Sequence, residues 1–502
     1  MKTRRRKHTN APPKICQKEK LDFEECEQAI MRAAVDEIDA FQQKNKVQNG
    51  PEIHKIMSIV EGFIRRKRLV LYGGQAINSI LPRHAQFYGA SDIPDYDFFT
   101  TNSPRDAREL ADEFYAAGYT DVEAKSGVHK GTQKVYVSNI PAADLTQQDP
   151  TIFAHLQKDA IVVDGIHYAP PNWLRMGMYL ELCRTYGDTT RFEKVLKRLT
   201  LLNKYHPMKT PHGCHDIQFQ RASTSAETAA NAGEQIYDIV RNVFIQQNVV
   251  FFGGYAMSLY SQYMPAAQRR IVRKIGDFDV LSEDIDRVAR IAVEQLKQGG
   301  FARATTTAHP PVGEVVPRSI EIRVGAETVA FLYEPDECVN YNEVSAAQNG
   351  AGASLGTVRV ASIDTILRYY LAFLYTGRPY YDIERLLCMA NFLFRVQQQN
   401  RLTQRGLLRR FTTTCIGQQH TLEDIRAEKA EEFKRLRGKQ TDPEYEQWFL
   451  KYVPAEAKTP KKERDARAAN TPKKEREAAP HPKRAKKKTK KRRATASSGY
   501  LF

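Results

Sequence analysis

Residues 69–82 read LVLYGGQAINSILP, and residues 249–262 read VVFFGGYAMSLYSQ. Each stretch begins with a short apolar run typical of a buried strand, continues through a glycine pair and enters a helix-like segment. A segment with apolar residues at helical spacing precedes each run, and an Asp-x-Asp pair follows the second glycine after 21 residues in one copy and 23 in the other. The sequence therefore predicts an internal repeat of helix, strand, glycine pair, helix and acidic strand.

The segments that follow the two repeats have a helical pattern. Residues 172–205 show helical periodicity with a break near Gly187, and residues 361–395 show it with a break at residues 377–379. An amphipathic helix is expected at residues 23–41, ahead of the first repeat. The pattern predicts an α+β fold of two tandem α/β units, each followed by helical segments.

A length of 502 residues implies more than one domain. The predicted divisions are a basic tail and N-terminal helix at 1–48, the first α/β unit at 49–165, a helical segment at 166–225, the second α/β unit at 226–355, a C-terminal helical region at 356–455 and a basic tail at 456–502. No stretch approaches the roughly 20 apolar residues that a membrane span needs. We therefore expect no membrane partner.

The net charge of +17 is concentrated at the two ends of the sequence. Residues 1–14 contain six basic and no acidic side chains, and residues 456–493 contain 17 basic and five acidic ones, which leaves the rest of the chain close to neutral. Such segments are expected to be disordered and to attract polyanions without sequence preference. A nuclear-import signal in KKKTKKRR is the alternative interpretation of the second tail.

The seven cysteines are scattered, odd in number and without a Cys-x-x-Cys pair. This pattern predicts free thiols in a reducing compartment. His212, Cys214 and His215 are close in sequence, but no second Cys/His pair lies at zinc-site spacing, so an ordinary loop is the favoured interpretation.

The acidic pair of the first repeat, Asp95 and Asp97, indicates a metal site. Residues i and i+2 of a strand point to the same face, so the two carboxylates converge, and carboxylates that close repel each other unless cations lie between them. Oxygen ligands of this kind suit Mg²⁺ or Mn²⁺. Asp144, an acid in an otherwise apolar strand-like segment, is the expected third ligand, with a strand-end cap as the alternative. The glycine pair, Gly73 and Gly74, would expose backbone N–H groups at a helix start as an anion site, although such pairs are often ordinary turns.

The motifs resemble the DNA polymerase β-like nucleotidyltransferase superfamily, in which a glycine pair is followed by Asp-x-Asp and a third strand Asp. More narrowly, LYGGQAINSILP, DIPDYDFF, VHKGTQKVYV and APPNWLRMGMYLELCR, followed by RFEKVLKRLTLL, resemble the catalytic poly(A) polymerase subunits of poxviruses, asfarviruses and mimivirus-type viruses. The resemblance covers roughly residues 50–400. It implies two tandem nucleotidyltransferase-like units and a template-independent polymerase that adds AMP from ATP to the 3′ end of mRNA with a divalent metal.

Carried onto this sequence, the resemblance implies that Gly73 and Gly74 hold the triphosphate. It also implies that Asp95, Asp97 and Asp144 are both the catalytic residues and the ligands of Mg²⁺ or Mn²⁺, with ATP as the substrate.

Basic residues of the following helical segment are candidates to bind the triphosphate, with a solvated helix face as the alternative for each: Lys194, Lys197 and Arg198. Gln75 departs from the wider superfamily, where many members have Ser after the glycine pair. Which side chain supports the phosphates at that position is therefore open.

The second repeat is expected to be inactive. It retains the glycine and aspartate pairs, which are Gly253, Gly254, Asp277 and Asp279. Where the first repeat reads Ala-Asp-Leu around Asp144, the second reads Ala-Phe-Leu around Phe331, and Glu321 is a substitute acid only on an earlier strand. We predict a degenerate unit that serves packing, with RNA or partner binding as a further role.

Other functions share these motifs. A uridylyltransferase, a CCA-adding enzyme or an oligoadenylate synthase would need the same carboxylates, and a non-catalytic RNA-binding subunit is the alternative from another class. The resemblance implies the RNA 3′ end and ATP as partners and leaves open a homodimer or a viral cap-methyltransferase or processivity subunit. It implies the host cytoplasm as the location, at a viral factory, with packaging in the virion as an extension.

Overall fold

The computed structural model describes residues 22, 25–35, 50–89, 96–214, 230–263, 277–345 and 356–458. Asp95, His215, residues 1–14 and residues 459–502 lie outside these residues, so what the sequence predicts of them stays a prediction. The chain divides into two compact units, residues 1–59 with 88–94 and residues 60–87 with 95–502. In the smaller unit residues 25–35 are helical, within the predicted amphipathic helix, and Ile30 is 42% exposed.

The elements of the first repeat follow in the order that the sequence predicts. They are α3 (Gly50–Lys67), β1 (Val70–Leu71), α4 (Gly73–Ile80), η1 (Arg83–Ala85), β2 (Asp97–Thr100), α5 (Ser103–Ala116), β3 (Val122–Ser126), β4 (Thr132–Val137), β5 (Ile140–Gln147), α6 (Pro150–Lys158), β6 (Ile161–Val163), β7 (Ile166–Tyr168), α7 (Pro171–Cys183), η2 (Thr189–Arg191) and α8 (Phe192–Tyr205). The helix break near Gly187 is confirmed, because α7 ends at Cys183 and α8 begins at Phe192.

The second repeat and the C-terminal region contain the remaining described elements. They are α9 (Ala230–Gln246), β8 (Val250–Phe251), α10 (Gly254–Tyr260), η3 (Ser261–Tyr263), β9 (Phe278–Leu281), α11 (Ile285–Gln298), β10 (Ala304–His309), β11 (Ser319–Val324), β12 (Glu327–Tyr333), β13 (Val339–Ser345), β14 (Thr357–Ala361), α12 (Ile363–Phe373), α13 (Ile383–Gln399), η7 (Gly406–Leu408), β15 (Cys415–Ile416), α14 (Leu422–Arg435), α15 (Pro443–Phe449), β16 (Lys451–Tyr452) and α16 (Pro454–Lys458). Of the described helices, none is long and apolar enough to cross a membrane.

The strand order confirms the internal repeat. Among the described residues, one sheet has the order β16-β3-β4-β5-β2-β1-β7-β6 and the other the order β10-β11-β12-β9-β8-β14-β13-β15. From β3 to β6 and from β10 to β13 the two sheets match strand for strand, including the parallel pairs β2–β5 and β9–β12. The division into six segments stays a prediction. Strands β7 and β14 lie just after the predicted ends of the two α/β units, at residues 165 and 355, and still pair with strands of these sheets.

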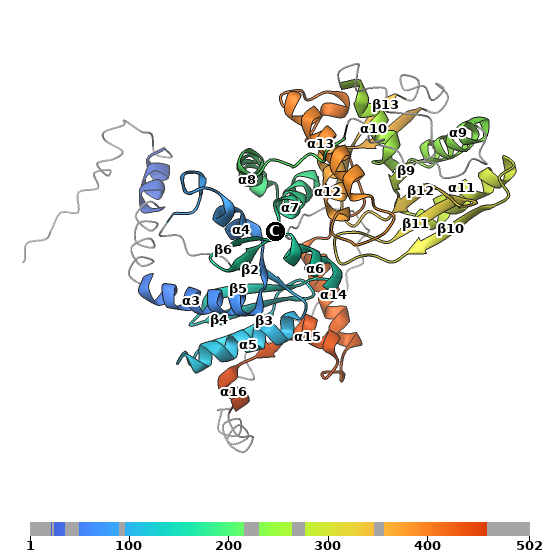
Figure 1. The fold of residues 1–502 in the computed structure, drawn as a ribbon. Helices are drawn as coiled ribbons and strands as arrows, with labels where there is room; N and C mark the ends of the chain where they lie inside the picture. The colour runs from blue at the N-terminus through green and yellow to red at the C-terminus, as the bar shows by residue number, and fades with distance from the viewer. Residues whose placement is uncertain are drawn as a thin grey trace, which may run out of the picture. The chain divides into compact units, whose positions relative to one another are not determined.

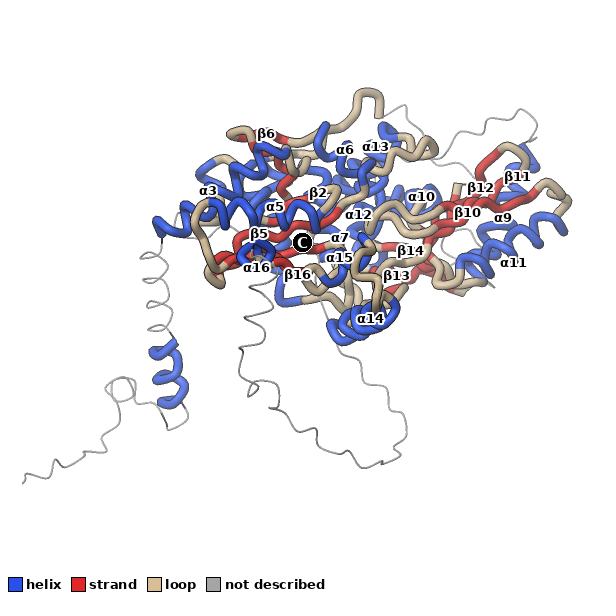
Figure 2. Tube along the Cα trace, turned by 90° about the horizontal axis from the view of Figure 1, so that it is seen from below, coloured by secondary structure: helices blue, strands red, loops and turns tan. Residues whose placement is uncertain are grey.

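Each sheet has one face covered by two helices and a second face turned toward a later helix. In the first repeat, α5 packs on β3 and β4, and Phe63 of α3 contacts Phe98 of β2 on that same face (Figure 1). In the second repeat, α9 and α11 pack together and contact strands of their sheet. The later helices, α7 and α12, pack against each other between the two groups of strands (Figure 2). This arrangement leaves one face of each sheet for the chemistry of its Asp-x-Asp strand.

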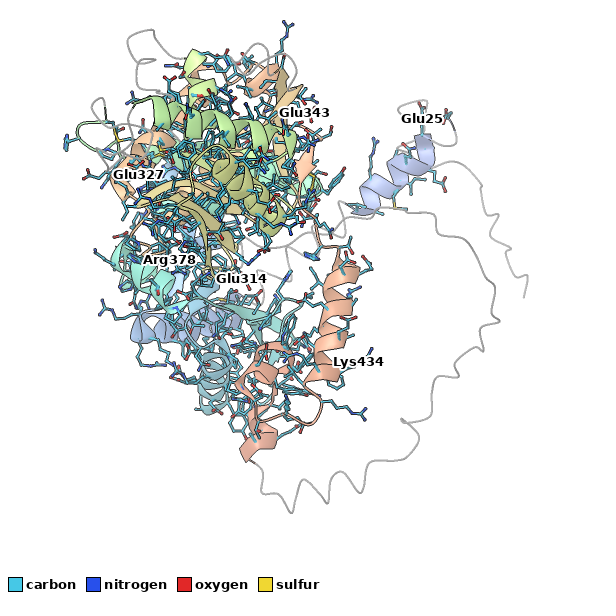
Figure 3. All side chains as sticks on the ribbon, turned by 90° about the vertical axis from the view of Figure 1, so that its right-hand side faces the viewer. Glu25, Glu314, Glu327, Glu343, Arg378 and Lys434 are labelled. Atoms are coloured by element: carbon cyan, nitrogen blue, oxygen red, sulfur yellow. A yellow bond between two sulfur atoms is a disulfide. The ribbon has the colours of Figure 1, made fainter. Side chains whose placement is uncertain are left out.

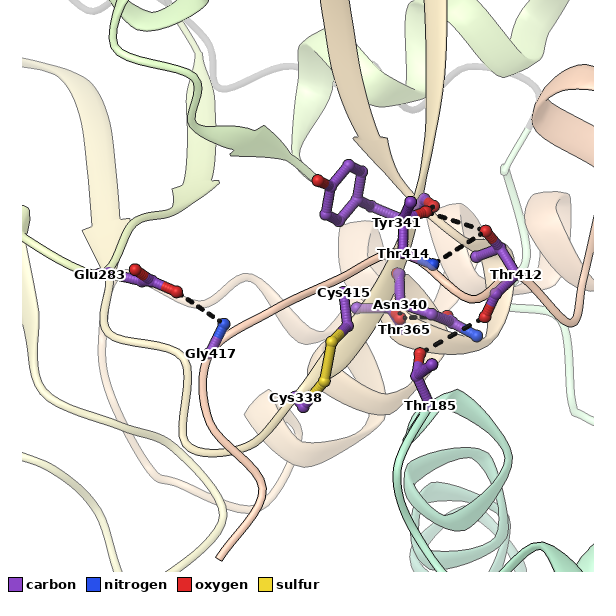
Figure 4. The surroundings of a disulfide bond; sticks show 10 residues. All are labelled: Thr185, Glu283, Cys338, Asn340, Tyr341, Thr365, Thr412, Thr414, Cys415 and Gly417. Atoms are coloured by element: carbon purple, nitrogen blue, oxygen red, sulfur yellow. Dashed lines mark hydrogen bonds between the residues drawn. A yellow bond between two sulfur atoms is a disulfide. The ribbon is translucent and has the colours of Figure 1, made fainter. Parts of the chain in front are cut away.

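The expectation of free thiols is wrong. The fold joins Cys214 to Cys388 and Cys338 to Cys415, which are 174 and 77 residues apart in sequence, so local spacing could not reveal either pair. The second disulfide anchors β15 beside β13 (Figure 4). Cys183, buried in α7, is the free cysteine among the described residues and accounts for the odd number.

Candidate active site

Asp97 and Asp144 occupy paired positions on two adjacent parallel strands. Asp97 begins β2, and the strand register places it directly beside Asp144 of β5. Paired positions on parallel strands present their side chains to the same face, and neighbouring strands lie about 4.8 Å apart. The two carboxylates are therefore neighbours on one face of the first sheet.

That face is the one turned toward α7. Phe99, two residues after Asp97, points the same way and meets the Trp173 ring edge-on at 5.8 Å. Tyr72, at the end of β1, stacks on Phe99 at 3.9 Å and shares a hydrogen bond of 2.9 Å with the Thr146 hydroxyl. Burial raises the pKa of the Tyr72 hydroxyl, and the charges of Asp97 and Asp144 raise it further. The carboxylates thus lie at the border of a buried aromatic floor.

The first glycine of the pair faces Asp97 closely. Gly73 has a φ of +72°, which disfavours a side chain, and a Cβ there would lie 2.8 Å from the Asp97 carboxylate oxygen Oδ2. The Tyr72 amide donates to the Asp97 carbonyl at 3.0 Å, which fixes the turn against β2. Helix α4 starts at this glycine, and no side chain of the described residues caps it. Its N–H groups are therefore available to an anion beside the carboxylates.

Lys134 is a site residue that the sequence analysis missed. It lies opposite Asp144 in the register of β4 and β5, and its ammonium forms an ion pair with the Asp144 carboxylate. Burial lowers the pKa of Lys134, but the charge and hydrogen bond of Asp144, with a contribution from Asp97, raise it above its ordinary value. One signal was available in the sequence. Thr132, Lys134 and Tyr136 alternate with more buried residues along β4, which places Lys134 on the less buried face of the strand.

The residues present fit a divalent cation. Asp97 and Asp144 supply hard oxygen donors next to an anion-binding helix start, which is the chemistry that Mg²⁺ or Mn²⁺ prefers. Within the described residues no group of three His, Cys, Asp or Glu side chains lies close enough to hold a metal. Asp95 is not described, so the three-carboxylate site stays a prediction.

A cavity of about 700 Å³ opens on this face of the sheet at Phe99 and Thr146, two residues along their strands from Asp97 and Asp144, which do not themselves line it. Its floor includes Phe99, Thr146 and Trp173 of the first repeat. Other walls come from the second repeat and the C-terminal region, through Glu314, Asp336, Glu337, Arg368, Gln419, His420 and Trp448. Glu314 is labelled in Figure 3 and follows Gly313, whose Cβ position would lie 3.0 Å from Ile152 of α6. The cavity is therefore built jointly by both repeats.

Several buried polar atoms around this cavity have no hydrogen-bond partner within the described chain. They are Trp173 Nε1, Arg368 Nε and Nη1, Gln419 Oε1 and Trp448 Nε1. Arg368 is 1% exposed and is held by an ion pair with Asp336. Buried donors and acceptors are nearly always satisfied, so these atoms mark the wall of the cavity as unusually polar. Sequence reasoning could not find them, because they come from four segments far apart in the chain.

A family comparison matches part of the chain, within the first repeat. Residues 58–188 match the poly(A) polymerase catalytic subunit family. A candidate poly(A) polymerase catalytic subunit of African swine fever virus is 32% identical over 167 residues, which are 32% of this chain and 35% of that protein. Its counterpart in Acanthamoeba polyphaga mimivirus is 27% identical over 164 residues, 32% of this chain and 27% of that protein. The aligned segment spans about a third of each relative, and it confirms the resemblance predicted from the sequence.

The fold extends the similarity to nearly the whole chain. The crystal structure of the Megavirus polyadenylate synthase superposes with a TM-score of 0.70, covering 93% of this chain and 92% of that one at 18% identity. At that identity the match concerns the fold alone. It confirms the predicted α+β fold, which consists of two tandem α/β units with helical segments.

The basic side chains predicted to bind the triphosphate lie on α8, outside the cavity of the poly(A) polymerase segment. Lys194 is exposed, Lys197 pairs with Glu193 at 2.7 Å, and the Arg198 guanidinium lies over the Phe87 ring at 4.8 Å. None of them lines the cavity, and their role stays a prediction. The amide of Gln75 donates to the Ser79 hydroxyl at 3.4 Å within α4.

The second repeat has lost the polar face of the first repeat. The β9–β12 register pairs Phe331 with Asp279, as the β2–β5 register pairs Asp144 with Asp97. Glu321 lies opposite Phe331, at the position of Lys134, and its carboxylate accepts from Thr328 Oγ1 at 2.5 Å and contacts His309 at 3.1 Å. The third carboxylate of the first repeat is thus replaced by an aromatic ring.

A cation and aromatic rings of the chain fill this second site. The Arg385 guanidinium lies 3.3 Å from the carboxylate of Asp277, which is 2% exposed, and Tyr380 stacks on Phe331 at 5.1 Å. Both Arg385 and Tyr380 come from the connection between α12 and α13 or the helix after it. The protein supplies here the positive charge that a metal would otherwise bring to the aspartates.

His129 makes ligand binding in the first cavity pH-dependent. Burial lowers the pKa of His129, and the nearby Arg184, Lys134 and Lys429 lower it further, so the free protein holds this ring neutral at pH 7. A polyanion in the cavity raises that pKa again, so binding takes up a proton. We expect the affinity for a nucleoside triphosphate to rise roughly threefold or more from pH 8 to pH 6, because protonation of His129 adds a positive charge to the cavity.

Equilibrium binding of ATP measured across this pH range checks the expectation. His129→Gln should flatten the pH dependence, whereas His420→Gln, which removes another histidine of the same cavity, should leave it steep. An equal slope in wild type and His129→Gln would assign the effect to another group.

Proposed function

We propose that the chain is a template-independent polynucleotide adenylyltransferase that adds AMP from ATP to the 3′-OH of mRNA. The observation that carries the proposal is the pairing of Asp97 with Asp144 over the Gly73 turn, inside the segment that matches the family. The poly(A) polymerase and polyadenylate synthase names of the relatives support ATP as the nucleotide.

The residues divide the work between binding and charge. The N–H groups at the start of α4 receive phosphate oxygens, next to the Asp97 carboxylate that the Gly73 turn faces. Asp97 and Asp144, together with Asp95, would hold Mg²⁺ or Mn²⁺, which neutralises the triphosphate and lowers the pKa of the attacking hydroxyl.

In the reaction itself, the RNA 3′-OH loses its proton to solvent and its oxygen bonds to the α-phosphorus of ATP. The bond from the α-phosphorus to the bridging oxygen breaks, and pyrophosphate leaves with that electron pair. Lys134 is placed to keep the Asp144 carboxylate oriented toward the reacting end, because its ammonium already binds that side chain.

Nucleotide selectivity tests the proposal. The purified full-length chain is incubated with a labelled single-stranded RNA and each NTP in turn, with Mg²⁺ and then with Mn²⁺. We expect extension with ATP and at least about tenfold slower extension with UTP, CTP or GTP, the discrimination that hydrogen-bonded base recognition readily supplies. Preference for UTP, or addition of only CCA, would replace the assignment by another terminal nucleotidyltransferase. No extension with any NTP would leave an RNA-binding subunit.

Partners and location are proposed on the same basis. The RNA 3′ end and ATP are the proposed partners, with a second copy of the chain or a cap-methyltransferase or processivity subunit as the candidate protein partner. The host cytoplasm is the proposed site of action. The disulfides of Cys214 and Cys338 favour packaging in the virion as a second location, because disulfides persist in oxidising surroundings.

A further inference from the structure

A second cavity, of about 810 Å³, lies between α8, the end of α13 and residues 400–411. We name it the α8–α13 groove. Its lining residues are Leu196, Leu199, Thr200, Asn203, Lys204, Ile363, Phe394, Gln397, Gln398, Asn400, Arg401, Leu402, Gln404, Leu407, Leu408, Arg409, Arg410 and Phe411. None of these residues lines the first cavity, the one of about 700 Å³. The groove is therefore a separate feature.

The charge of this groove has one sign. Its lining includes the cations Lys204, Arg401, Arg409 and Arg410 and contains no Asp or Glu. The first cavity, by contrast, is lined by five carboxylates as well as basic groups. Arg410 is paired with the buried Asp364, so Lys204, Arg401 and Arg409 are the cations that attract an anion making several contacts.

One of the cations is fixed in place. Arg410 Nε donates to the Asp364 carboxylate at 2.5 Å, and that carboxylate, which is fully buried, also accepts from Gln397 Nε2 at 2.8 Å. Arg410 Nη2 has no hydrogen-bond partner within the described chain. That atom is buried, so Arg410 stiffens the wall of the groove, and its exposed neighbours Arg401 and Arg409 offer the cations to a ligand.

The groove also offers aromatic and amide groups. Leu402 is 96% exposed and Phe411 is 42% exposed, and the Phe411 ring lies 6.4 Å from Phe192 and 5.3 Å from the Arg410 guanidinium. Five amide side chains line the same groove, namely those of Asn203, Gln397, Gln398, Asn400 and Gln404. Cations for phosphates, an exposed ring for base stacking and amides for base edges together are the chemistry of single-stranded nucleic acid sites.

Helix α8 links the groove to the first repeat. The Tyr205 hydroxyl contacts His84 Nε2 at 3.0 Å, and Arg198 lies over Phe87, both just beyond the helix that starts at the glycine pair. A strand bound along α8 could therefore pass from the groove toward the catalytic side of the first sheet.

We propose that the α8–α13 groove binds single-stranded RNA upstream of the 3′ end that is extended. The groove holds several nucleotides through their phosphates and stacks a base on Phe411. The position of this RNA upstream of an extended 3′ end rests on the proposed function. An acidic segment of another protein would meet the same cations but would gain little from the stacking ring.

The test compares two arginine pairs that remove equal charge. Arg401→Gln/Arg409→Gln changes exposed groove residues, and Arg426→Gln/Arg437→Gln changes exposed residues of α14 and its end, outside both cavities. Binding of a labelled oligoadenylate is measured by fluorescence anisotropy with the full-length chain, without ATP, over a range of salt concentrations. We expect the groove pair to weaken binding about tenfold and to lower the salt slope by about 0.7 for each phosphate that is no longer neutralised, while the control pair changes affinity less than about twofold.

Phe411→Ala tests the stacking contribution separately from charge. We expect it to weaken oligoadenylate binding about five- to tenfold with an unchanged salt slope, because it removes stacking and no cation. Equal effects of the two arginine pairs, or no effect of Phe411→Ala, would overturn the proposal in favour of nonspecific attraction or an acidic protein partner. If the groove variants lose RNA affinity but the wild-type protein fails to extend RNA with any of the four NTPs, the proposed polymerase activity is wrong while the RNA groove stands.

Discussion

Replacing Asp144 with Asn reduces nucleotide addition at least about a thousandfold, the size of effect expected when a carboxylate that holds a catalytic metal is lost. The change keeps the shape of the side chain and removes its charge, so the paired position beside Asp97 can no longer share a divalent cation. The fold should be little affected. Asp144 and its partner Lys134 are 20% and 34% exposed, and ion pairs at such positions contribute about 1 kcal/mol or less.

The second sheet provides a matched control for this change. Asp279 holds the position in β9 that Asp97 holds in β2, but its neighbour in the register is Phe331. Asp279→Asn should therefore change the rate less than about threefold, because Phe331 stands there in place of the carboxylate that Asp144 supplies in the first repeat. Single-turnover extension of a labelled RNA, with thermal unfolding measured in parallel, checks both variants. A residual rate above about one tenth in Asp144→Asn, or an equal loss in Asp279→Asn, would contradict the assignment of the first repeat as the active one.

The sequence was sufficient for features that repeat along the chain. The glycine pairs and Asp-x-Asp pairs placed both nucleotidyltransferase-like units, because strand periodicity and local turn chemistry leave a pattern in a single segment. Counting along the two copies also aligned Phe331 with Asp144, and the structure confirms that both lie beside the second Asp of their pair.

Features built from several segments could not be obtained in this way. Lys134 acquires its partner only through the pairing of β4 with β5, and Arg368 enters the first cavity from the second repeat. The disulfides join cysteines that lie in different parts of the chain, so scattered spacing suggested free thiols. In each case the missing information was which distant segments pack together.

Replacing Asp277 with Ala destabilises the protein while sparing its catalysis. Asp277 is 2% exposed and its partner Arg385 has a side chain that is 12% exposed, so removal of the carboxylate leaves a buried guanidinium without its counter-charge. Breaking a buried ion pair by removing one partner typically costs about 3–5 kcal/mol. The midpoint of urea unfolding should fall accordingly, whereas the rate per folded molecule should stay within a few fold of wild type, because the pair lies in the second repeat.

A double variant separates the charge from the packing. In Asp277→Leu/Arg385→Met both partners become apolar and of similar volume, and such replacements are often neutral or stabilising. We expect the unfolding midpoint to return most of the way to that of wild type, while Arg385→Met alone should be destabilised like Asp277→Ala. If Asp277→Ala and Arg385→Met were both as stable as wild type, Asp277 and Arg385 would not form a buried ion pair. A lost rate in the double variant, with its stability restored, would mean instead that the second repeat takes part in catalysis, and the inactive role inferred from Phe331 would then be wrong.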